Sequence, residues 1–317
     1  MDTLIIMLKN VLIFVLLAVP GYLLVKGKVL GQQESGIFSK LLTNIGMPFL
    51  ILSSTLKLKF NPELTKNIIL VGVLGCLFIL GMFFITGLLC RDADTKRRGM
   101  LRMCAIFANN GFIGIPLAAA VFGADSRVMA YLIVLNILNN VFMFTLGVYL
   151  VSGDKRAISL NKAVLNPVLI AFVAGIGLNL LGVNRVLPEV QTYATHFSGI
   201  VTPLSMVILG IKLAGVPMKR LFSSGRMFYA SFLRLVLFPV LAVAMMLLLE
   251  LVPVLALGAD GVLAFFVAFA MPVAGLASAF ADQYDGDGED AVVLTLGSTV
   301  LSVVTIPVLY WLLRLVV

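Results

Sequence analysis

The sequence predicts an all-α membrane protein with ten transmembrane helices, built as two inverted five-helix repeats with two broken crossover helices. Its composition, its succession of apolar segments and its internal repetition lead to this prediction. Of 317 residues, 61% are hydrophobic and 12% charged, and the mean hydropathy is +1.11. Soluble domains are about half apolar and about one quarter charged. This composition argues against a soluble enzyme, a nucleic-acid-binding protein or a disordered chain.

The apolar segments follow one another with short, charged loops between them. A transmembrane helix needs about 20 mostly apolar residues, and the sequence offers ten such segments. Several, such as the run from Asn67 to Cys90, are apolar on every face, as helices in lipid or buried in protein are. The segments span roughly residues 5–27, 36–57, 67–90, 99–122, 128–151, 162–182, 189–213, 227–251, 260–281 and 290–314.

The second half of the chain repeats motifs of the first at a nearly constant separation. Pro48 in segment two matches Pro203 in segment seven, and the motif ending at Pro116 in segment four matches the one ending at Pro272 in segment nine. Each repeat therefore holds five segments, and an odd number inverts the second repeat relative to the first. The predicted division is residues 1–151, a short cytoplasmic linker 152–161, and residues 162–317.

The basic residues predict the orientation in the membrane. Sixteen of the 23 Lys and Arg residues lie in or beside the loops that follow segments one, three, five, seven and nine. The positive-inside rule places these loops in the cytoplasm and both termini outside it, in a multi-pass protein of the plasma (inner) membrane. The acidic stretch at residues 282–290 falls on the same side, and we interpret it as a solvated turn leading into a helix start.

Segments four and nine carry the features of a transport site. Segment four contains Asn109, Asn110 and Gly111 before Pro116, and segment nine contains Pro272. Proline interrupts helices, and unwound backbone at membrane depth is tolerated only inside protein or beside a watery cavity. Two broken segments in corresponding positions of inverted repeats indicate a binding site, with helix N-termini restarting near the two prolines. Kinked helices with packing glycines are the alternative.

Other polar residues in the segments are candidates for the same site. Asn136 and Asn140 share a helix face in segment five, where binding a ligand and joining helices are equally good explanations. Ser278, Ser53 and Ser205 are further candidates, although serine also packs between membrane helices. Arg234 lies eight residues inside segment eight, and we expect its side chain to snorkel to the cytoplasmic surface.

The sequence offers little for catalysis or for a cofactor. The acidic residues lie in loops or near segment ends, so no carboxylate pair for a proton relay or an intramembrane protease is visible. The three cysteines and the single histidine form no metal motif. We therefore expect a protein that is not an enzyme and that carries no metal or cofactor.

The motifs resemble those of a known transporter family. The stretch from Phe107 to Pro116, the stretch from Met271 to Phe280 and the segment ending at Pro307 are similar to those of the auxin efflux carrier family, over essentially the whole chain. That family includes plant auxin carriers and bacterial permeases, and is related to the bile-acid sodium symporters. The resemblance implies an elevator-like cycle of a scaffold and a transport domain, with Asn109, Asn110, Pro116 and Pro272 at the crossover. The short linker indicates a bacterial-type member.

The expected function is secondary transport of small organic anions, such as carboxylates or auxin-like indole acids. The anion would be held by amides and helix ends, and Na⁺ or H⁺ is the candidate coupling ion. A sodium symporter of the bile-acid type is one alternative, and a membrane receptor or scaffold without transport is another. Membrane lipids are expected partners, nucleic acid is not, and the resemblance implies a homodimer.

Overall fold

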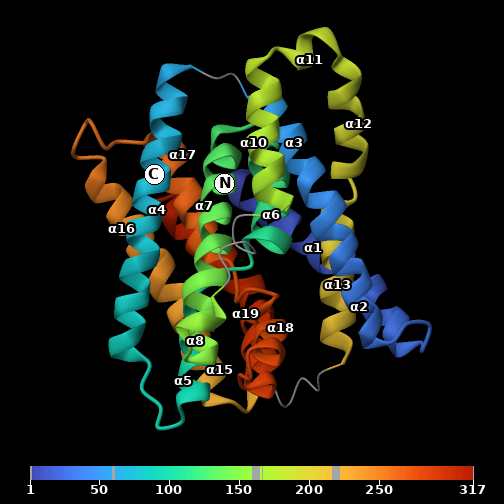
Figure 1. The fold of residues 1–317 in the computed structure, drawn as a ribbon, viewed down its shortest axis with the longest axis vertical. Coiled ribbons are helices and arrows are strands. Elements are labelled where there is room, and N and C mark those ends of the chain that lie inside the picture. Colours follow the sequence, from blue (N-terminus) through green and yellow to red (C-terminus); the bar gives the residue numbers. More distant parts are fainter. Residues whose placement is uncertain (1, 59–60, 159–164, 166, 216–221, 317) are drawn as a thin grey trace. The chain divides into compact units, whose positions relative to one another are not determined.

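The computed structural model describes residues 2–58, 61–158, 165, 167–215 and 222–316 (Figure 1). These residues are helical, and their β-structure is limited to one isolated bridge. Six helices are long and apolar enough to cross a membrane, and four shorter apolar helices accompany them. A helical multi-pass membrane protein is therefore confirmed, while the count of ten spanning helices and their inverted arrangement remain predictions.

Helix α4 (Pro62–Leu89) illustrates how the sequence builds a spanning helix. Asn61 precedes it, and the Asn61 side chain accepts a hydrogen bond from the Leu64 N–H at 2.7 Å, which satisfies one of the free donors at the helix start. Pro62 fits the first turn, where no backbone partner is lost. Along the helix, Phe84 and Leu88 are among several large apolar side chains that lie exposed, as expected for a surface covered by lipid.

The backbone contacts divide the chain into two compact units. Unit 1 comprises residues 1–66, 111–133 and 165–217, and unit 2 comprises residues 67–110, 134–164 and 218–317. Each unit thus draws on both halves of the sequence. Helix α7 (Arg127–Phe142) begins in unit 1 and continues in unit 2.

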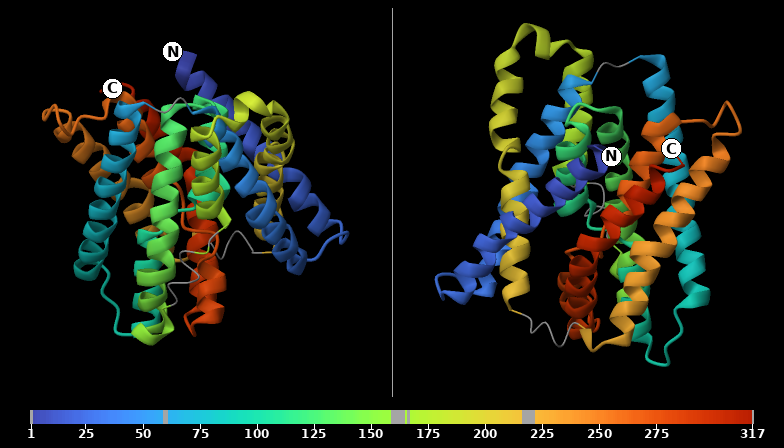
Figure 2. Two further views of the ribbon diagram at one scale, coloured as in Figure 1. Left: turned by 45° about the horizontal axis from the view of Figure 1, so that its top comes forward. Right: turned by 180° about the vertical axis from the view of Figure 1, so that it is seen from behind.

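Unit 1 is organised around two helix pairings. Helix α1 (Asp2–Lys26) crosses α13 (Val201–Ala214), as the right-hand view of Figure 2 shows, and α3 (Met47–Lys57) packs on α10 (Pro167–Leu180) and α12 (Pro188–Ser198). The other described helices that lie wholly in the unit are η1 (Gln32–Glu34), α2 (Ser35–Leu41), η2 (Leu42–Gly46), α6 (Ile115–Phe122) and α11 (Val183–Val186).

Side-chain amides and glycines fix these pairings. The Asn179 amide on α10 donates to the carbonyl oxygens of Thr55, Leu56 and Leu58, in the last turn of α3 and just beyond its end. At the crossing of α1 and α13, a Cβ atom on Gly210 would lie 1.9 Å from the Ala18 carbonyl oxygen. The two backbones can therefore approach this closely only with glycine at that position.

Unit 2 contains the helices that flank the two predicted breaks. They are α5 (Thr95–Ile106), η3 (Asn110–Gly114, continuing into unit 1), η4 (Met143–Gly147), α8 (Val148–Ser152), α15 (Gly225–Phe232), η6 (Leu233–Leu237), α16 (Phe238–Leu249), α17 (Gly258–Ala270), α18 (Ala277–Gln283) and α19 (Gly288–Leu313). Helix α19 packs on α5, α15 and α18, and α8 packs on α5.

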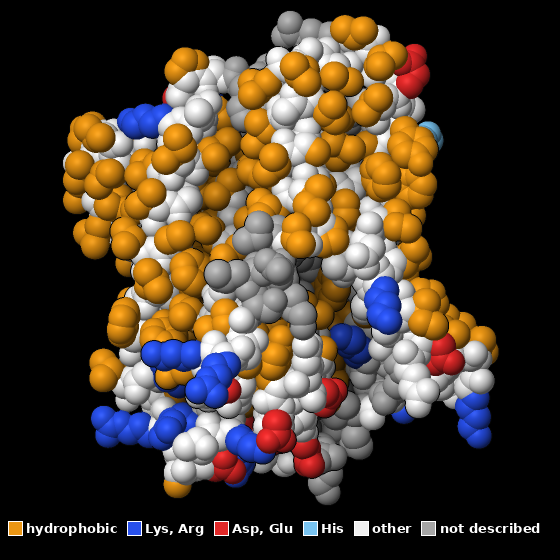
Figure 3. All heavy atoms as spheres, viewed as in Figure 1, with side chains coloured by type: hydrophobic (Ala, Val, Ile, Leu, Met, Phe, Trp, Pro, Cys, Tyr) orange, Lys and Arg blue, Asp and Glu red, His pale blue; other side chains and the backbone are white. Residues whose placement is uncertain are grey.

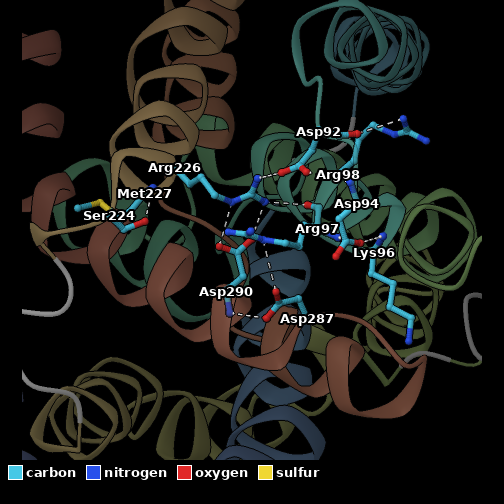
Figure 4. Close-up of polar contacts among 10 residues, drawn as sticks. All are labelled: Asp92, Asp94, Lys96, Arg97, Arg98, Ser224, Arg226, Met227, Asp287 and Asp290. Atoms are coloured by element: carbon cyan, nitrogen blue, oxygen red, sulfur yellow. Dashed lines mark hydrogen bonds and ion pairs between the residues drawn. The ribbon is translucent and has the colours of Figure 1, made fainter.

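The charged residues of unit 2 gather where α4, α8 and α18 end and where α5, α15 and α19 begin (Figure 3). We call this region the charged end; it comprises residues 91–98, 155–156, 226 and 285–290. Arg226 contacts both Asp92 and Asp290 (Figure 4). Lys96 pairs with Asp285 at 2.5 Å. The acidic stretch therefore lies among basic residues that neutralise it.

The acidic stretch also begins a helix. The Asp287 side chain accepts a hydrogen bond from the Asp290 N–H at 2.9 Å and caps the start of α19, as the interpretation of a helix start requires. The linker prediction falls partly outside the described residues, since residues 159–161 are not among them. Its described part holds a short 3-10 turn, η5 (Lys155–Ala157).

Candidate functional site

Two helices of unit 2 stop inside the unit, and the chain segments that follow them cross. Helix α5 ends at Ile106 and α17 ends at Ala270, and residues 107–109 and 271–274 are the crossing segments. The Asn109 N–H donates to the Pro272 carbonyl at 2.8 Å, and the Ala274 N–H donates to the Phe107 carbonyl at 2.9 Å. These bonds pair Ala108 with Val273 as a short antiparallel bridge. The bridge satisfies backbone groups that lipid could not.

Two side chains from neighbouring helices complete the hydrogen bonds of the crossing. The Asn139 amide on α7 accepts from the Ala108 N–H at 3.1 Å and donates to the Ala108 carbonyl at 3.2 Å, so it pairs with that residue as a third strand would. On α19, the Ser298 hydroxyl accepts from the Val273 N–H at 3.1 Å and donates to the Thr295 carbonyl at 2.9 Å. Asn139, Ser298 and the bridged residues are all buried.

Arg234 contacts the backbone at the crossing and is completely buried, so the prediction that it snorkels to the surface is wrong. Its guanidinium donates to the carbonyl oxygens of Met271 at 2.9 Å, Ile106 at 2.8 Å and Ala268 at 3.2 Å. These carbonyls belong to the C-terminal ends of α5 and α17. A helix C-terminus carries unsatisfied carbonyl acceptors and a partial negative charge. One guanidinium that contacts two helix C-termini therefore donates hydrogen bonds to these carbonyls and also offsets the partial charge.

The break in segment nine contains the predicted proline, whereas the break in segment four lies ahead of its proline. In segment four the extended backbone covers residues 107–109 and so includes Asn109. The helix resumes at Asn110 as the π-turn η3, and Pro116 is the second residue of α6. The wide turn ahead of Pro116 accommodates a residue that lacks an N–H. In segment nine Pro272 is itself extended, and the helix resumes at Ala277. The two prolines therefore occupy different places, and the expectation of helix starts beside both is corrected.

Two buried amides of unit 2 have polar atoms without a protein partner. Asn136 is 1% exposed, and neither its amide nitrogen nor its amide oxygen has a hydrogen-bond partner among the described residues. Asn110 is 2% exposed, and among the same residues its side-chain oxygen lacks a partner. Leaving such a group unpaired costs about 1–3 kcal/mol. Both positions are therefore suited to receive a hydrogen-bonding ligand.

The other predicted site residues are distributed over both units. In unit 2, Asn109 and Pro272 form the crossing, while Asn140 and Ser278 are half-buried on α7 and α18. In unit 1, Ser53 bonds to Thr195 and Gln191 on α12, and Ser205 bonds to the Thr202 carbonyl of its own helix. Gly111 and Pro116 also belong to unit 1.

Sequence reasoning missed three residues that hold the crossing together. Arg234 was assigned to the surface, whereas Asn139 and Ser298 were not selected for the site. Ser298 lies one turn before Ser302 on a buried face of α19, and this spacing was the available signal. In the described part of the chain, Arg234 is the only buried charged residue. The same residues contain no group of three His, Cys, Asp or Glu side chains that could hold a metal ion.

Comparison with known proteins identifies relatives over nearly the whole chain. The sequence model of a family described as "Membrane transport protein" matches twice, at residues 6–160 and 155–310. A protein of Methanothermobacter thermautotrophicus named an uncharacterized transporter is 28% identical, over 94% of this chain and 96% of its own length. Another uncharacterized transporter, from Methanocaldococcus jannaschii, is 26% identical over 66% of this chain and 70% of its own length.

Proposed function

This chain belongs to the membrane transport protein family, an auxin efflux carrier-like family, and from that premise we propose that it is a secondary transporter of small organic anions. Carboxylates and auxin-like indole acids are the proposed substrate class. The family and the transporter-named relatives support transport itself. The chemical class of the substrate rests on the polar groups of unit 2.

The observation that carries the proposal is the pair of buried amides in unit 2 whose polar atoms lack partners among the described residues. Asn136 and Asn110 present amide atoms without partners among the described residues, and Arg234 is the one charge that the described residues bury. The ends of α5 and α17 already offset the charge of Arg234, and the described residues bury no carboxylate, so an anion would meet no buried negative side chain there. Neutral amides bind a carboxylate without the strong attraction of a buried lysine, which would slow its release.

The proposed mechanism is alternating access by an elevator-type movement. The division of the chain into two compact units supports it, with unit 2, which contains the crossing, as the transport domain and unit 1 as the scaffold. Asn109, Asn110, Asn136 and Asn140 would hold the anion within the transport domain. Because the backbone of the crossing is bonded to Arg234, Asn139 and Ser298, unit 2 can move as a body without breaking these bonds.

The test is uptake of radiolabelled carboxylates and indole acids into proteoliposomes. Asn136→Leu removes an amide that has no partner among the described residues, so the variant should unfold at the same temperature as the wild-type protein or higher. Loss of a hydrogen bond to an anionic ligand should nevertheless lower transport efficiency about tenfold or more. The matched control is Asn44→Leu, because the Asn44 side chain is exposed and bonds only within its own helix turn, to the Lys40 carbonyl.

Four outcomes decide between this proposal and its rivals. Unchanged carboxylate uptake by Asn136→Leu and Asn110→Ala would show that the site is elsewhere. Uptake that requires an imposed sodium gradient would favour the symporter of the bile-acid type, whereas dependence on a pH gradient would identify H⁺ as the coupling ion. No flux of any tested anion would favour a receptor or scaffold.

A further inference from the structure

A polar cavity lies at the charged end of unit 2, away from the crossing. It has a volume of about 500 Å³ and lies where α4 ends and α5 begins. Arg91, Arg98 and Arg102 line it, together with Asp92 and the small residues Gly87, Cys90 and Ala93. Three arginines around one cavity form a concentration of positive charge that the proposed transport site does not use.

Each arginine is held in place by one backbone carbonyl. Arg91 donates to Leu88 at 3.2 Å, Arg98 donates to Asp92 at 3.3 Å, and Arg102 donates to Phe83 at 2.8 Å. The Arg102 guanidinium also lies 4.8 Å from the centre of the Phe83 ring, and its buried Nε has no partner among the described residues. A guanidinium carries five N–H donors, so most remain for a ligand once the side chain is positioned.

The carboxylate in the cavity does not cancel this charge. Asp92 contacts the guanidinium of Arg226, and one of its oxygens accepts from the Asp94 N–H at 3.0 Å (Figure 4). Arg226, which Asp92 shares with Asp290, offsets part of this negative charge from outside the cavity, and inside it three guanidinium groups face one carboxylate. The remaining three guanidinium groups suit a phosphate, because their fork geometry matches two oxygens of a phosphate group.

The surroundings favour a phosphate carried by a lipid. Phe84 and Leu88, which are 68% and 70% exposed, lie on α4 within two turns of Arg91. The apolar run of α4 ends at Leu89 and charged residues begin at Arg91, so the cavity lies where the membrane interior gives way to the headgroups. Basic pockets between helices at this depth accept anionic headgroups. We propose that this cavity binds the phosphate of an anionic phospholipid, whose acyl chains cover Phe84 and Leu88.

The test compares lipids and variants on the purified full-length protein in neutral detergent. Native mass spectrometry and thermal unfolding are measured with added phosphatidylglycerol, phosphatidylcholine, glycerol phosphate or inorganic phosphate. Phosphatidylglycerol should remain bound and raise the unfolding temperature, whereas phosphatidylcholine, which carries a compensating cation, should do neither. The double variant Arg91→Gln/Arg98→Gln should reduce phosphatidylglycerol binding about tenfold or more, because each lost pair removes a hydrogen bond to a charged group.

A matched variant separates this cavity from general attraction to the basic surface. Lys155→Gln/Arg156→Gln removes two exposed cations from the same end of unit 2 that do not line the cavity, and it should bind phosphatidylglycerol like the wild-type protein. Equal losses in both double variants would overturn the proposal in favour of unspecific attraction. Stabilisation by glycerol phosphate or inorganic phosphate alone would overturn the lipid assignment and identify a site for soluble phosphate compounds.

Discussion

At the scale of single residues, Arg234 has the most demanding environment. It is a buried cation, and its hydrogen-bond partners in the described residues are backbone carbonyls rather than a carboxylate. Each helix C-terminus carries a partial charge of about −0.5, so the ends of α5 and α17 together offset about one positive charge. The side chain is therefore a structural tie between two interrupted helices.

Removing this tie should destabilise unit 2. Arg234→Gln leaves buried carbonyl oxygens of Ile106, Ala268 and Met271 without the cation, and we expect a loss of about 3–5 kcal/mol in the free energy of unfolding. Denaturant unfolding of the purified protein in detergent measures this loss in free energy of unfolding. Arg314→Gln, at an exposed position, should change the stability by less than about 0.5 kcal/mol. A near-wild-type Arg234→Gln would show that the guanidinium does not hold the two helices together.

Asp92 gives the charged end a dependence on pH. The hydrogen bond from the Asp94 N–H, and after it the charges of Arg226 and Arg97, lower the pKa of Asp92 from its ordinary value of 3.8. A lowered pKa in the folded state stabilises the protein above the unfolded pKa, and this contribution is lost as pH falls through the folded value. Asp92→Asn should therefore lower the unfolding temperature at pH 7. The difference from wild type should shrink once the pH falls below about 4. A difference that is the same at pH 7 and pH 3 would contradict this assignment.

At the scale of helices, unit 1 depends on a close approach of α1 and α13. A Cβ atom on Gly21 would lie 2.1 Å from the Val207 carbonyl oxygen, and one on Gly210 would meet the Ala18 carbonyl oxygen, so each helix contributes one glycine to the crossing. Backbones this close gain dispersion contacts along both helices, and small residues are how membrane helices achieve this. The crossing therefore tolerates no larger side chain at either position without a shift of the backbone.

Alanine substitutions test this contact. Gly210→Ala should cost about 1–3 kcal/mol, because the added methyl group forces the helices apart. Gly177→Ala is the control within unit 1, since Gly177 lies in helix α10 with open space around it, and there alanine should be neutral or stabilising by up to about 1 kcal/mol. The unfolding temperature of Gly210→Ala should therefore be lower than that of the wild-type protein, whereas that of Gly177→Ala should be equal or higher. Equal unfolding temperatures would argue against the tight crossing.

At the scale of the whole molecule, the sequence predicted helices and loops better than the details of the crossing. The length of the apolar segments and the placement of the charged residues predicted a helical membrane protein. The adjacent amides Asn109 and Asn110 indicated an interrupted segment. The exact break was misplaced because Pro116 was taken as the cause, whereas a π-turn absorbs that proline. Arg234 and Asn139 could not be assigned because their partners, Ile106 and Ala108, lie far away in the sequence.

The predicted orientation can be checked by labelling. In a variant without Cys76, Cys90 and Cys104, a cysteine at Lys155 or Asp285 should react with an impermeant maleimide only in inverted vesicles. A cysteine at Leu181, an exposed position at the end of segment six, should react in intact cells. The reason is the excess of basic residues on the side of Lys155. The reverse pattern would place both termini in the cytoplasm.

The bridge between Ala108 and Val273 also has a consequence for biogenesis. Residues 107–109 leave the ribosome long before Arg234, Pro272 and Ser298 have been synthesised. Until then the carbonyls of Ile106 and Phe107 and the N–H of Asn109 lack their final partners, and lipid cannot supply substitutes. The first broken helix must therefore wait in a hydrated or protein-lined setting, such as the insertion machinery, and the interior of unit 2 is completed only when the C-terminal part of the chain arrives.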